Sequence, residues 1–342
     1  MPAPLLVSRD RHLHDEVARL AAAAGVAPEM RPPDVSALQG WALAPLVLVG
    51  ADAAAEVVAL APPRRAHVHL CTDREGDAAY RTALALGAER VLTLPTDAAW
   101  LTERLIDAGD GATGRGRLVG VLAGSGGAGA TTFACALGQV AARSGPAIVV
   151  DADPWGPGVD RVLGLDATAG VRWPDLESTA GRLGARALRE SLPAREGLAA
   201  LAWPAGNATP VPLGVLRECL SAARRGHDLV VVDLPRGADP LVNDVVSRCD
   251  LVVVLAAPTV CGTASATSSV ARFERRGRWG LVVRGRGLDP DEVARVTGLP
   301  LLAEMSDQRR VAESVDLGLG PVRSRRGPLA RAAARVLEEV DR

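Results

Sequence analysis

The sequence predicts an α/β protein of two domains, each built on a parallel sheet that is covered by helices. Short apolar runs of strand type alternate with Ala- and Leu-rich segments of helical spacing along the whole chain. The length of 342 residues exceeds that of one ordinary domain. A Gly-rich polar stretch separates two such series, so we expect domains at 1–108 and 118–342 with a linker at 109–117.

In the first series, strands and helices alternate regularly. We expect strands at Leu5–Ser8, Leu46–Gly50, His67–Thr72 and Arg90–Leu94, and helices at His14–Ala24, Ala53–Leu60, Ala78–Leu86 and Trp100–Ala108. This alternation is typical of a parallel sheet in which each crossover connection is a helix.

The second series contains longer apolar runs. We expect strands at Leu118–Ala123, Ala147–Asp151, Leu229–Asp233, Leu251–Ala256 and Gly280–Val283, and a closing helix at Leu329–Val340. Apolar runs without polar alternation are typical of parallel strands whose two faces are both buried. The segment 175–212 is less regular, and we expect one helix within it, at Leu183–Ser191.

The composition excludes several classes of protein. No apolar run reaches the ~20 residues of a membrane-spanning helix, and the N-terminus lacks the pattern of a secretory signal. We therefore expect a soluble, cytoplasmic protein. The net charge of −1 gives no general attraction to nucleic acid or anionic lipid. All 39 residues counted as Lys plus Arg are arginines, so any chemistry that requires a lysine ammonium is absent.

Cysteines and histidines show no metal-binding pattern. The five cysteines are scattered without a Cys-x-x-Cys pair, and each lies in or beside an apolar segment, so we expect buried free thiols. The pairs His12/His14 and His67/His69 lack companion ligands. We expect structural or exposed histidines, and no metal other than Mg²⁺ with a nucleotide.

A glycine-rich loop joins the first strand of the second series to a helix expected at Phe133–Arg143. The loop residues are Gly124, Ser125, Gly126, Gly127, Ala128, Gly129, Ala130, Thr131 and Thr132. Glycines at such a junction let backbone N–H groups surround phosphate oxygens, and the helix dipole adds a partial positive charge. In the common P-loop, Gly-x-x-x-x-Gly-Lys-Ser/Thr, the lysine contacts the β- and γ-phosphates and the next hydroxyl binds Mg²⁺. Here Ala130 stands in the lysine position, and Thr131 keeps the hydroxyl.

This loop resembles that of the MinD/ParA family, Lys-Gly-Gly-x-Gly-Lys-Thr-Thr, which residues 125–132 match at every position except the two lysines. In that family the first lysine reaches across a nucleotide-sandwich dimer to the partner's phosphates, and Ser125 stands in its place. The loss at Ala130 removes a cation where charge-assisted hydrogen bonds are about twice as strong as neutral ones. The resemblance, with these departures, implies weak binding of ATP or ADP with Mg²⁺ and little or no turnover.

Four further segments carry the resemblance. Residues 149–160 resemble the switch I segment, in which Asp153 takes the position of the carboxylate that orients the attacking water. The alternative is that Asp151 and Asp153 only cap a turn after a strand. Residues 227–237 resemble the Walker B strand and switch II, which implies that Asp233 and Thr131 hold Mg²⁺. Residues 249–259 and 299–304 resemble later strands of the family.

One position departs from the family beyond the loop. After the strand Gly280–Val283 the family carries Asn-Arg and uses the asparagine amide to read adenine, whereas Arg284 stands here. A guanidinium offers donors only, so this residue does not suit adenine recognition. Residues 124–129 also match the dinucleotide fingerprint Gly-x-Gly-x-x-Gly, with Asp151 or Asp153 as the acidic residue, which leaves a Rossmann domain as an alternative. The later motifs disfavour it.

The first domain resembles a response-regulator receiver, a flavodoxin-like fold, in its element order and in residues 87–95. Leu94 replaces the lysine of the receiver's Lys-Pro pair. Gly50 ends the strand that should carry the phospho-acceptor, and Asp52 follows two residues later. Ser8-Arg9-Asp10 offers one carboxylate where receivers use a pair for Mg²⁺. The resemblance implies a pseudo-receiver that is not phosphorylated.

A receiver-like domain followed by a MinD-like domain is the arrangement of the CpaE/TadZ pilus-localisation proteins. The lysine-free loop is most similar to that of the actinobacterial CpaE-like septum-site-determining (Ssd) proteins. The resemblance implies a spatial regulator or scaffold that binds proteins of a Tad-type pilus/secretion machine or of the division apparatus, at the pole or septum, and that forms a homodimer. The alternative is an ATP-dependent, dimerising ATPase in which arginines or Mg²⁺ compensate for the lysines.

Two surface features bear on other partners. The expected closing helix has an apolar stripe but carries Glu338, Glu339 and Asp341 near its end. We therefore expect it to pack on its own domain rather than to bind membrane as in MinD, so that any membrane contact is peripheral. We expect a solvated basic face, rather than a ParA-like DNA-binding surface, from Arg272, Arg275, Arg276 and Arg278. Nucleic acid is therefore not an expected partner.

Overall fold

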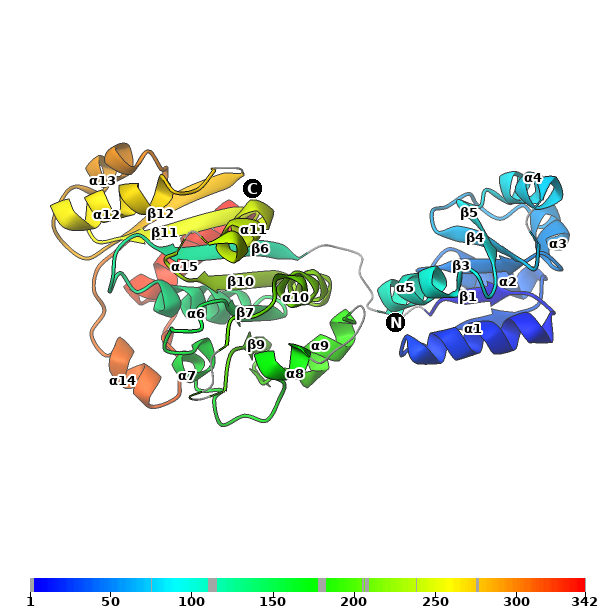
Figure 1. Cartoon of the computed structure of the whole chain (residues 1–342), viewed down its shortest axis with the longest axis horizontal. Coiled ribbons are helices and arrows are strands. Elements are labelled where there is room, and N and C mark those ends of the chain that lie inside the picture. Colours follow the sequence, from blue (N-terminus) through cyan, green and yellow to red (C-terminus); the bar gives the residue numbers. More distant parts are fainter. Residues whose placement is uncertain are drawn as a thin grey trace. The chain divides into compact units, whose positions relative to one another are not determined.

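The computed structural model describes residues 3–341 except 75, 110–115, 178–182, 205, 207, 208, 238, 275 and 276. The chain divides into two compact units, Met1–Thr113 and Gly114–Arg342 (Figure 1). Most of the expected linker, and two of the four arginines of the expected basic face, lie outside the described residues. Each unit is built on its own sheet, which confirms the predicted α/β class.

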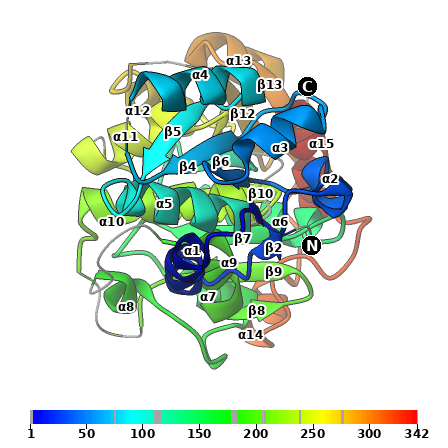
Figure 2. The same ribbon diagram turned by 90° about the vertical axis from the view of Figure 1, so that its right-hand side faces the viewer.

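The N-terminal unit has a five-stranded parallel sheet in the order β2-β1-β3-β4-β5, the flavodoxin-like order. Its strands are β1 (Leu5–Val7), β2 (Glu29–Arg31), β3 (Val47–Gly50), β4 (Val68–Thr72) and β5 (Arg90–Thr93), and its helices are α1 (Arg11–Ala23), α2 (Val35–Trp41), α3 (Ala54–Ala59), α4 (Asp77–Leu86) and α5 (Ala98–Gly109). Helices α1 and α5 pack on one face of the sheet, and α2, α3 and α4 pack on the other (Figure 2).

The C-terminal unit has an eight-stranded sheet in the order β13-β12-β11-β6-β10-β7-β9-β8, parallel except for β8 against β9. Its strands are β6 (Arg117–Ala123), β7 (Ala147–Asp151), β8 (Ala194–Arg195), β9 (Leu198–Leu201), β10 (Leu229–Leu234), β11 (Leu251–Ala256), β12 (Arg278–Arg284) and β13 (Leu301–Met305). Its helices are α6 (Ala130–Ala141), α7 (Val159–Leu163), α8 (Trp173–Glu177), α9 (Ala185–Ser191), α10 (Leu213–Gly226), α11 (Pro240–Arg248), α12 (Val260–Val270), α13 (Pro290–Thr297), α14 (Val311–Asp316) and α15 (Pro328–Val340).

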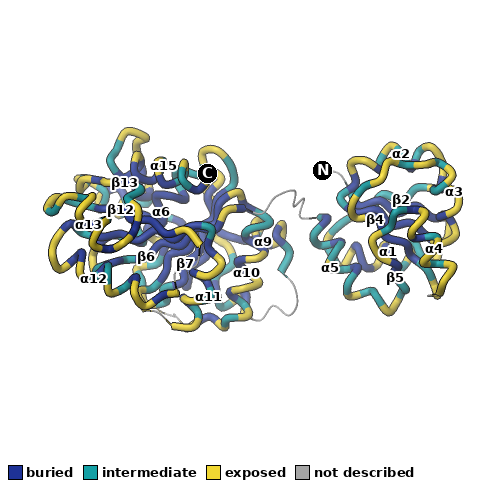
Figure 3. Tube along the Cα trace, turned by 90° about the horizontal axis from the view of Figure 1, so that it is seen from above, coloured by how far each residue is buried: buried dark blue, intermediate teal, exposed yellow. Residues whose placement is uncertain are grey.

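Both faces of the larger sheet are covered. Helices α6, α7 and α15 share one apolar cluster with the sheet, and α8 to α13 share the other. Strands β7, β10 and β11 are therefore buried at every residue, and β6 is buried except at its two ends, as the dark core in Figure 3 shows. The expected packing of the closing helix is confirmed, because Leu329, Ala333 and Val336 of α15 are buried in the first of these clusters.

Local sequence signals explain where several helices begin and end. Helices α11 and α13 each start with proline directly after an aspartate cap. The Asp239 carboxylate accepts from the Val242 N–H at 2.9 Å, and Asp289 caps α13 in the same way. Helix α13 ends at Gly298, which adopts a left-handed φ of 65°.

The structure corrects some expectations from sequence. Strand β2 and helix α2 were not expected, because Glu-Met-Arg at a sheet edge shows no apolar run. The segment 175–212 contains β8 and β9 besides α9, and Leu-Ala-Ala-Leu in β9 is too short to distinguish strand from helix. Buried thiols were wrong for Cys261, which is exposed at the start of α12, whereas the other four cysteines are buried.

Within the described ranges, no helix combines the length and apolarity needed to cross a bilayer. Among the same residues, no group of three or more His, Cys, Asp or Glu side chains is arranged to hold a metal ion.

Candidate functional site

The glycine-rich loop lies at the carboxyl end of β6, a central strand between β11 and β10. Gly127 and Gly129 adopt left-handed φ values of 74° and 90°, which favour glycine. At Gly124 an added Cβ would lie 2.7 Å from the Ala266 Cβ and 2.8 Å from the Leu255 carbonyl oxygen. The glycines therefore meet backbone requirements, and the loop is folded tightly against its neighbours.

Most N–H groups of the loop are not used within the fold. Gly124 donates to the Leu255 carbonyl at 2.8 Å and Ala128 donates to the Ser125 carbonyl at 3.3 Å. In the described part of the chain, no hydrogen bond uses the N–H groups of Gly126, Gly127 or Gly129. With the first turn of α6 they form a row of donors that suits phosphate oxygens.

The side chains of the loop bring no cation to these donors. Ala130 is the first residue of α6, and its methyl group is buried. Ser125 and Thr132 are half-buried, so both hydroxyls remain near the surface. The loop can therefore contribute backbone dipoles and hydroxyls to an anion, but no formal positive charge.

Thr131 and Asp233 lie together beside the loop. Asp233, near the end of β10, is buried, and this burial raises the pKa of its carboxyl to about 8. The neighbouring Thr131 side chain opposes the shift, while the carboxylates of Asp151 and Asp153 add to it. A hydroxyl beside a buried carboxyl is a donor set that fits Mg²⁺ with its water shell.

Asp151 and Asp153 both cap the turn that follows β7. The Asp151 carboxylate accepts from the N–H groups of Asp153 at 3.1 Å and Val159 at 3.0 Å. Burial raises its pKa to about 7, against the effect of those hydrogen bonds. Asp153 accepts from the Trp155 N–H at 3.1 Å. The turn-capping contacts expected under the structural alternative are therefore present, and Trp155 on this turn is 81% exposed.

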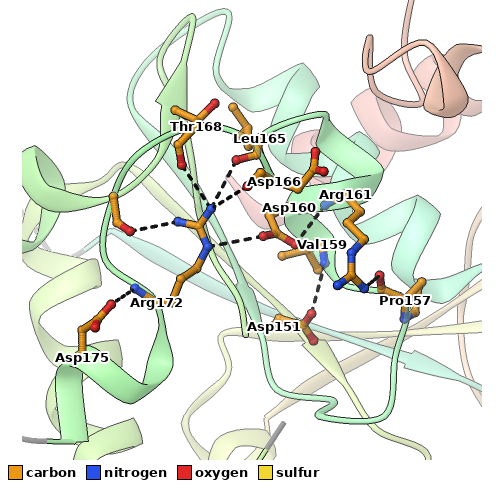
Figure 4. A network of polar contacts seen from close by, with 11 residues as sticks. Asp151, Pro157, Val159, Asp160, Arg161, Leu165, Asp166, Thr168, Arg172 and Asp175 are labelled. Atoms are coloured by element: carbon orange, nitrogen blue, oxygen red, sulfur yellow. Dashed lines mark hydrogen bonds and ion pairs between the residues drawn. The ribbon is translucent and has the colours of Figure 1, made fainter. Parts of the chain in front are cut away.

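Arg172, whose side chain is 11% exposed, fixes the chain beyond this turn (Figure 4). The Arg172 Nε lies 3.4 Å from an oxygen of the buried Asp160 carboxylate. Its other nitrogens donate to backbone carbonyls, namely those of Leu165, Asp166, Thr168 and Gly170. The next residue, Trp173, donates from its indole to the Asp151 carbonyl at 2.8 Å. These contacts hold the base of the switch I-like turn in place.

Two arginines reach the loop from other elements. The Arg284 Nη1, from the end of β12, donates to the Ala128 carbonyl at 3.3 Å, and its Nε donates to Asp307 at 3.0 Å. Arg236, after β10, donates to the Ser265 hydroxyl at 3.5 Å. Sequence reasoning singled out Arg284 as a changed base-reading position but not as a neighbour of the loop. No local signal shows this contact, because it depends on where the sheet places β12 and β13.

The N-terminal unit has a cluster of polar groups at the carboxyl ends of β1 and β3, the N-terminal polar cluster. The Asp52 carboxylate accepts from the Ser8 hydroxyl at 2.8 Å and from the Arg9 N–H at 2.7 Å. An added Cβ on Gly50 would lie 2.2 Å from Asp52 Oδ1, so this carboxylate fills the space above Gly50. The turn after β3 therefore brings Asp52 back over Gly50, which ends the strand expected to carry a receiver's acceptor. Arg9 also pairs with Glu56 at 2.9 Å.

Known proteins resemble this chain both over its N-terminal unit and over its whole length. Residues 7–116 match the family model "Rv3660c-like, CheY-like N-terminal domain". The uncharacterized protein Rv3660c of Mycobacterium tuberculosis is 38% identical over 337 residues, which cover 96% of this chain and 95% of that protein. The "Putative septum site-determining protein MinD" of Oltmannsiellopsis viridis is 26% identical over 219 residues, covering 60% of this chain and 69% of its own length.

Solved structures show the fold of the C-terminal unit. A ParA family ATPase from Chlorobium tepidum matches with a TM-score of 0.56 and 17% identity, over 64% of this chain and 96% of that one. The septum site-determining protein MinD of Pyrococcus horikoshii, in complex with Mg-ADP, matches with a TM-score of 0.53 and 19% identity, over 66% and 96%. The chain therefore belongs to the Rv3660c family, with a CheY-like N-terminal domain followed by a domain that has the fold of MinD and ParA ATPases.

Proposed function

We propose that this protein is a spatial regulator or scaffold that acts through protein contacts and has a weak nucleotide site. The observation that carries the proposal is the P-loop itself. Its fold, its unused N–H groups and the Thr131–Asp233 pair are kept, while Ala130 and Ser125 remove the two cations of the MinD/ParA loop. A loop that keeps the P-loop shape but binds phosphate more weakly suits a domain that presents a surface to partners.

The proposed nucleotide is ATP or ADP with Mg²⁺. The loop N–H groups would hold its phosphates, Thr131 and Asp233 would hold the ion, and bound Mg²⁺ would supply charge neutralisation for the phosphates. Asp153 stands in the position that would orient a water molecule. We propose little or no hydrolysis, because Asp153 already accepts from Trp155 and no lysine supports the phosphates.

For the N-terminal unit we propose a pseudo-receiver that does not take a phosphoryl group. Both oxygens of Asp52 accept hydrogen bonds from within the unit, and Arg9 stands near them with its charge paired to Glu56. Leu94 stands where the receiver lysine belongs.

In cellular terms we propose membership of the CpaE-like, Ssd type. Such a protein would be recruited to the pole or septum, with partners from a division apparatus or a Tad-type pilus/secretion machine, and would form a homodimer. The MinD relatives named above favour positioning as the general role. Direct nucleic-acid binding forms no part of this proposal, and contact with membrane would be peripheral.

The experiment is localisation of a fluorescent fusion in its host cell. Wild type is compared with Thr131→Ala, which removes the hydroxyl of the nucleotide site, and with Thr102→Ala on α5 as a surface control. The scaffold proposal expects foci at pole or septum in all three. Loss of foci in Thr131→Ala alone would instead support the second candidate, an ATP-switched dimerising ATPase, which the two arginines beside the loop favour.

A further inference from the structure

The P-loop lacks its own cation but is contacted by a guanidinium from a different strand. Arg284 Nη1 lies 3.3 Å from the Ala128 carbonyl oxygen. An added Cβ on Gly129 would lie only 2.4 Å from the same nitrogen. Gly129 directly precedes Ala130, so a positive charge reaches this part of the loop from β12 instead of from α6.

Arg284 is held in this position by a carboxylate. Its Nε donates to Asp307 Oδ1 at 3.0 Å, from the segment that follows β13. These two contacts use two of the five N–H groups of a guanidinium, which leaves three for a ligand. The Arg284 side chain is 37% exposed, so solvent and solutes can reach it. Fixing the side chain in advance reduces the entropy lost when a ligand binds.

We propose that Arg284 is the phosphate-contacting cation of this site and that Asp307 is its positioning carboxylate. The ligand class is a nucleoside di- or triphosphate, or another compound with a diphosphate group. A planar guanidinium can donate two parallel hydrogen bonds to phosphate oxygens, which an ammonium cannot do. This inference rests on the proposed nucleotide site and assigns to it a residue that replaces the missing lysine of the loop.

Arg236 has the weaker claim to this role. Its Nη1 lies 3.4 Å from an added Cβ on Gly126, and its one described hydrogen bond, to Ser265, is 3.5 Å long. No carboxylate in the described part of the chain pairs with it. Arg236 is therefore placed near the loop but is not fixed there, and we expect a smaller contribution from it.

Binding of a phosphate at this loop needs a nearby cation, because three carboxyl groups lie beside it. Asp151, Asp153 and Asp233 influence one another beside the loop, and their ionised forms would repel a phosphate. Arg284 then supplies the attraction that the loop side chains lack.

The test is calorimetric titration of the full chain at low ionic strength with three probes: Mg-ATP, Mg-ADP and inorganic pyrophosphate. Arg284→Gln is expected to weaken binding of all three by about tenfold or more. Arg286→Gln, two residues along on the same exposed loop, is the matched control and is expected to change binding by less than about twofold. Asp307→Asn keeps the cation and is expected to stay within about threefold of wild type. Equal unfolding temperatures for these variants show that the fold is intact.

A rescue experiment isolates the role of the charge. The double variant Ala130→Lys/Arg284→Gln is expected to bind as tightly as Ala130→Lys alone, to within about threefold, because the lysine restores the missing contact. Unchanged binding in Arg284→Gln overturns the inference. So does tighter binding, which would show that Arg284 blocks the site, and so does a defect that Ala130→Lys fails to repair.

The outcomes separate this inference from the proposed function. Absence of heat from wild type with every probe overturns the role of Arg284 but leaves the scaffold in place. Rapid ATP turnover that depends on Arg284 contradicts the scaffold but supports the role of Arg284. Heat from pyrophosphate equal to that from Mg-ADP identifies the diphosphate as the recognised group, as the inference requires.

Discussion

The two units each carry a polar cluster at the carboxyl edge of a parallel sheet, and we propose that each has lost a lysine. By the resemblance to receivers and to the MinD/ParA loop, Leu94 and Ala130 stand in the positions of these lysines. An arginine paired with a carboxylate lies beside each cluster, Arg9 with Glu56 and Arg284 with Asp307. The two clusters differ in what their other polar groups do.

In the N-terminal polar cluster the polar groups form hydrogen bonds with one another. Asp52 is bonded at both oxygens by Ser8 and Arg9 and fills the space above Gly50. In the P-loop the N–H groups of Gly126 and Gly127 have no partner among the described residues. The polar groups of the N-terminal cluster are therefore satisfied within the fold, whereas the P-loop keeps N–H groups that we propose bind phosphate.

The largest expected effect is on the free energy of unfolding, when one glycine of each polar cluster is replaced by alanine. Gly124→Ala should lower the free energy of unfolding by about 2 to 3 kcal/mol, because its Cβ would meet a backbone oxygen and the α12 helix. Gly50→Ala should cost less, about 1 kcal/mol, because its Cβ would meet only side-chain atoms, Asp52 Oδ1 at 2.2 Å and Ser8 Oγ at 2.7 Å, and no backbone atom. Urea unfolding of each variant measures both values. Equal losses of unfolding free energy in the two variants would contradict the distinction between a clash with backbone at Gly124 and a clash with side chains at Gly50.

A smaller effect concerns the pH dependence of stability. Burial raises the Asp233 pKa to about 8 from its usual 3.8, so the folded state holds a proton that the unfolded chain releases. Stability from this group is complete below about pH 4 and is lost as pH rises toward 8. Asp233→Asn, which is neutral at every pH, should flatten this slope and unfold at a higher temperature than wild type at pH 8. A wild-type unfolding temperature that is constant from pH 5 to 8 would contradict the buried, protonated carboxyl.

The smallest expected effect concerns phosphorylation and Mg²⁺ binding at the N-terminal polar cluster. Wild type incubated with acetyl phosphate and Mg²⁺ should show no phosphoryl adduct by intact mass, because Asp52 is bonded at both oxygens. Arg9→Ala removes the nearby cation, and we expect a slight Mg²⁺-dependent rise in unfolding temperature in this variant only. A phosphoryl adduct on wild type would contradict the pseudo-receiver, because it would show that Asp52 accepts a phosphoryl group despite its hydrogen bonds.

The fold was largely accessible from sequence because parallel strands buried on both faces are continuous apolar runs. Leu251–Ala256 and Ala147–Asp151 have the bounds that the sequence predicted. Strand β2 escaped prediction since a three-residue edge strand needs no apolar face. Strand β9 escaped because four residues of Leu and Ala fit either a strand or a helix, and only pairing with β7 decides between them.

The candidate site was accessible in its local parts only. The loop 124–132 and Asp233 follow from motif spacing, since the loop lies directly after β6 and Asp233 lies near the end of β10. Arg284 and Asp307 could not be paired from sequence, because the contact depends on the order β13-β12-β11-β6. The return of Asp52 to the space above Gly50 likewise depends on a turn geometry that residue types do not specify.

The central claim is that the P-loop keeps its shape but has lost most of its affinity for nucleotide. Calorimetric titration of wild type and Ala130→Lys with Mg-ATP tests this most directly. The account predicts that wild type binds no more tightly than about 100 μM and that Ala130→Lys binds at least about tenfold more tightly. Wild-type binding at about 1 μM, with no gain in Ala130→Lys, would contradict the account and support a protein that is switched by ATP.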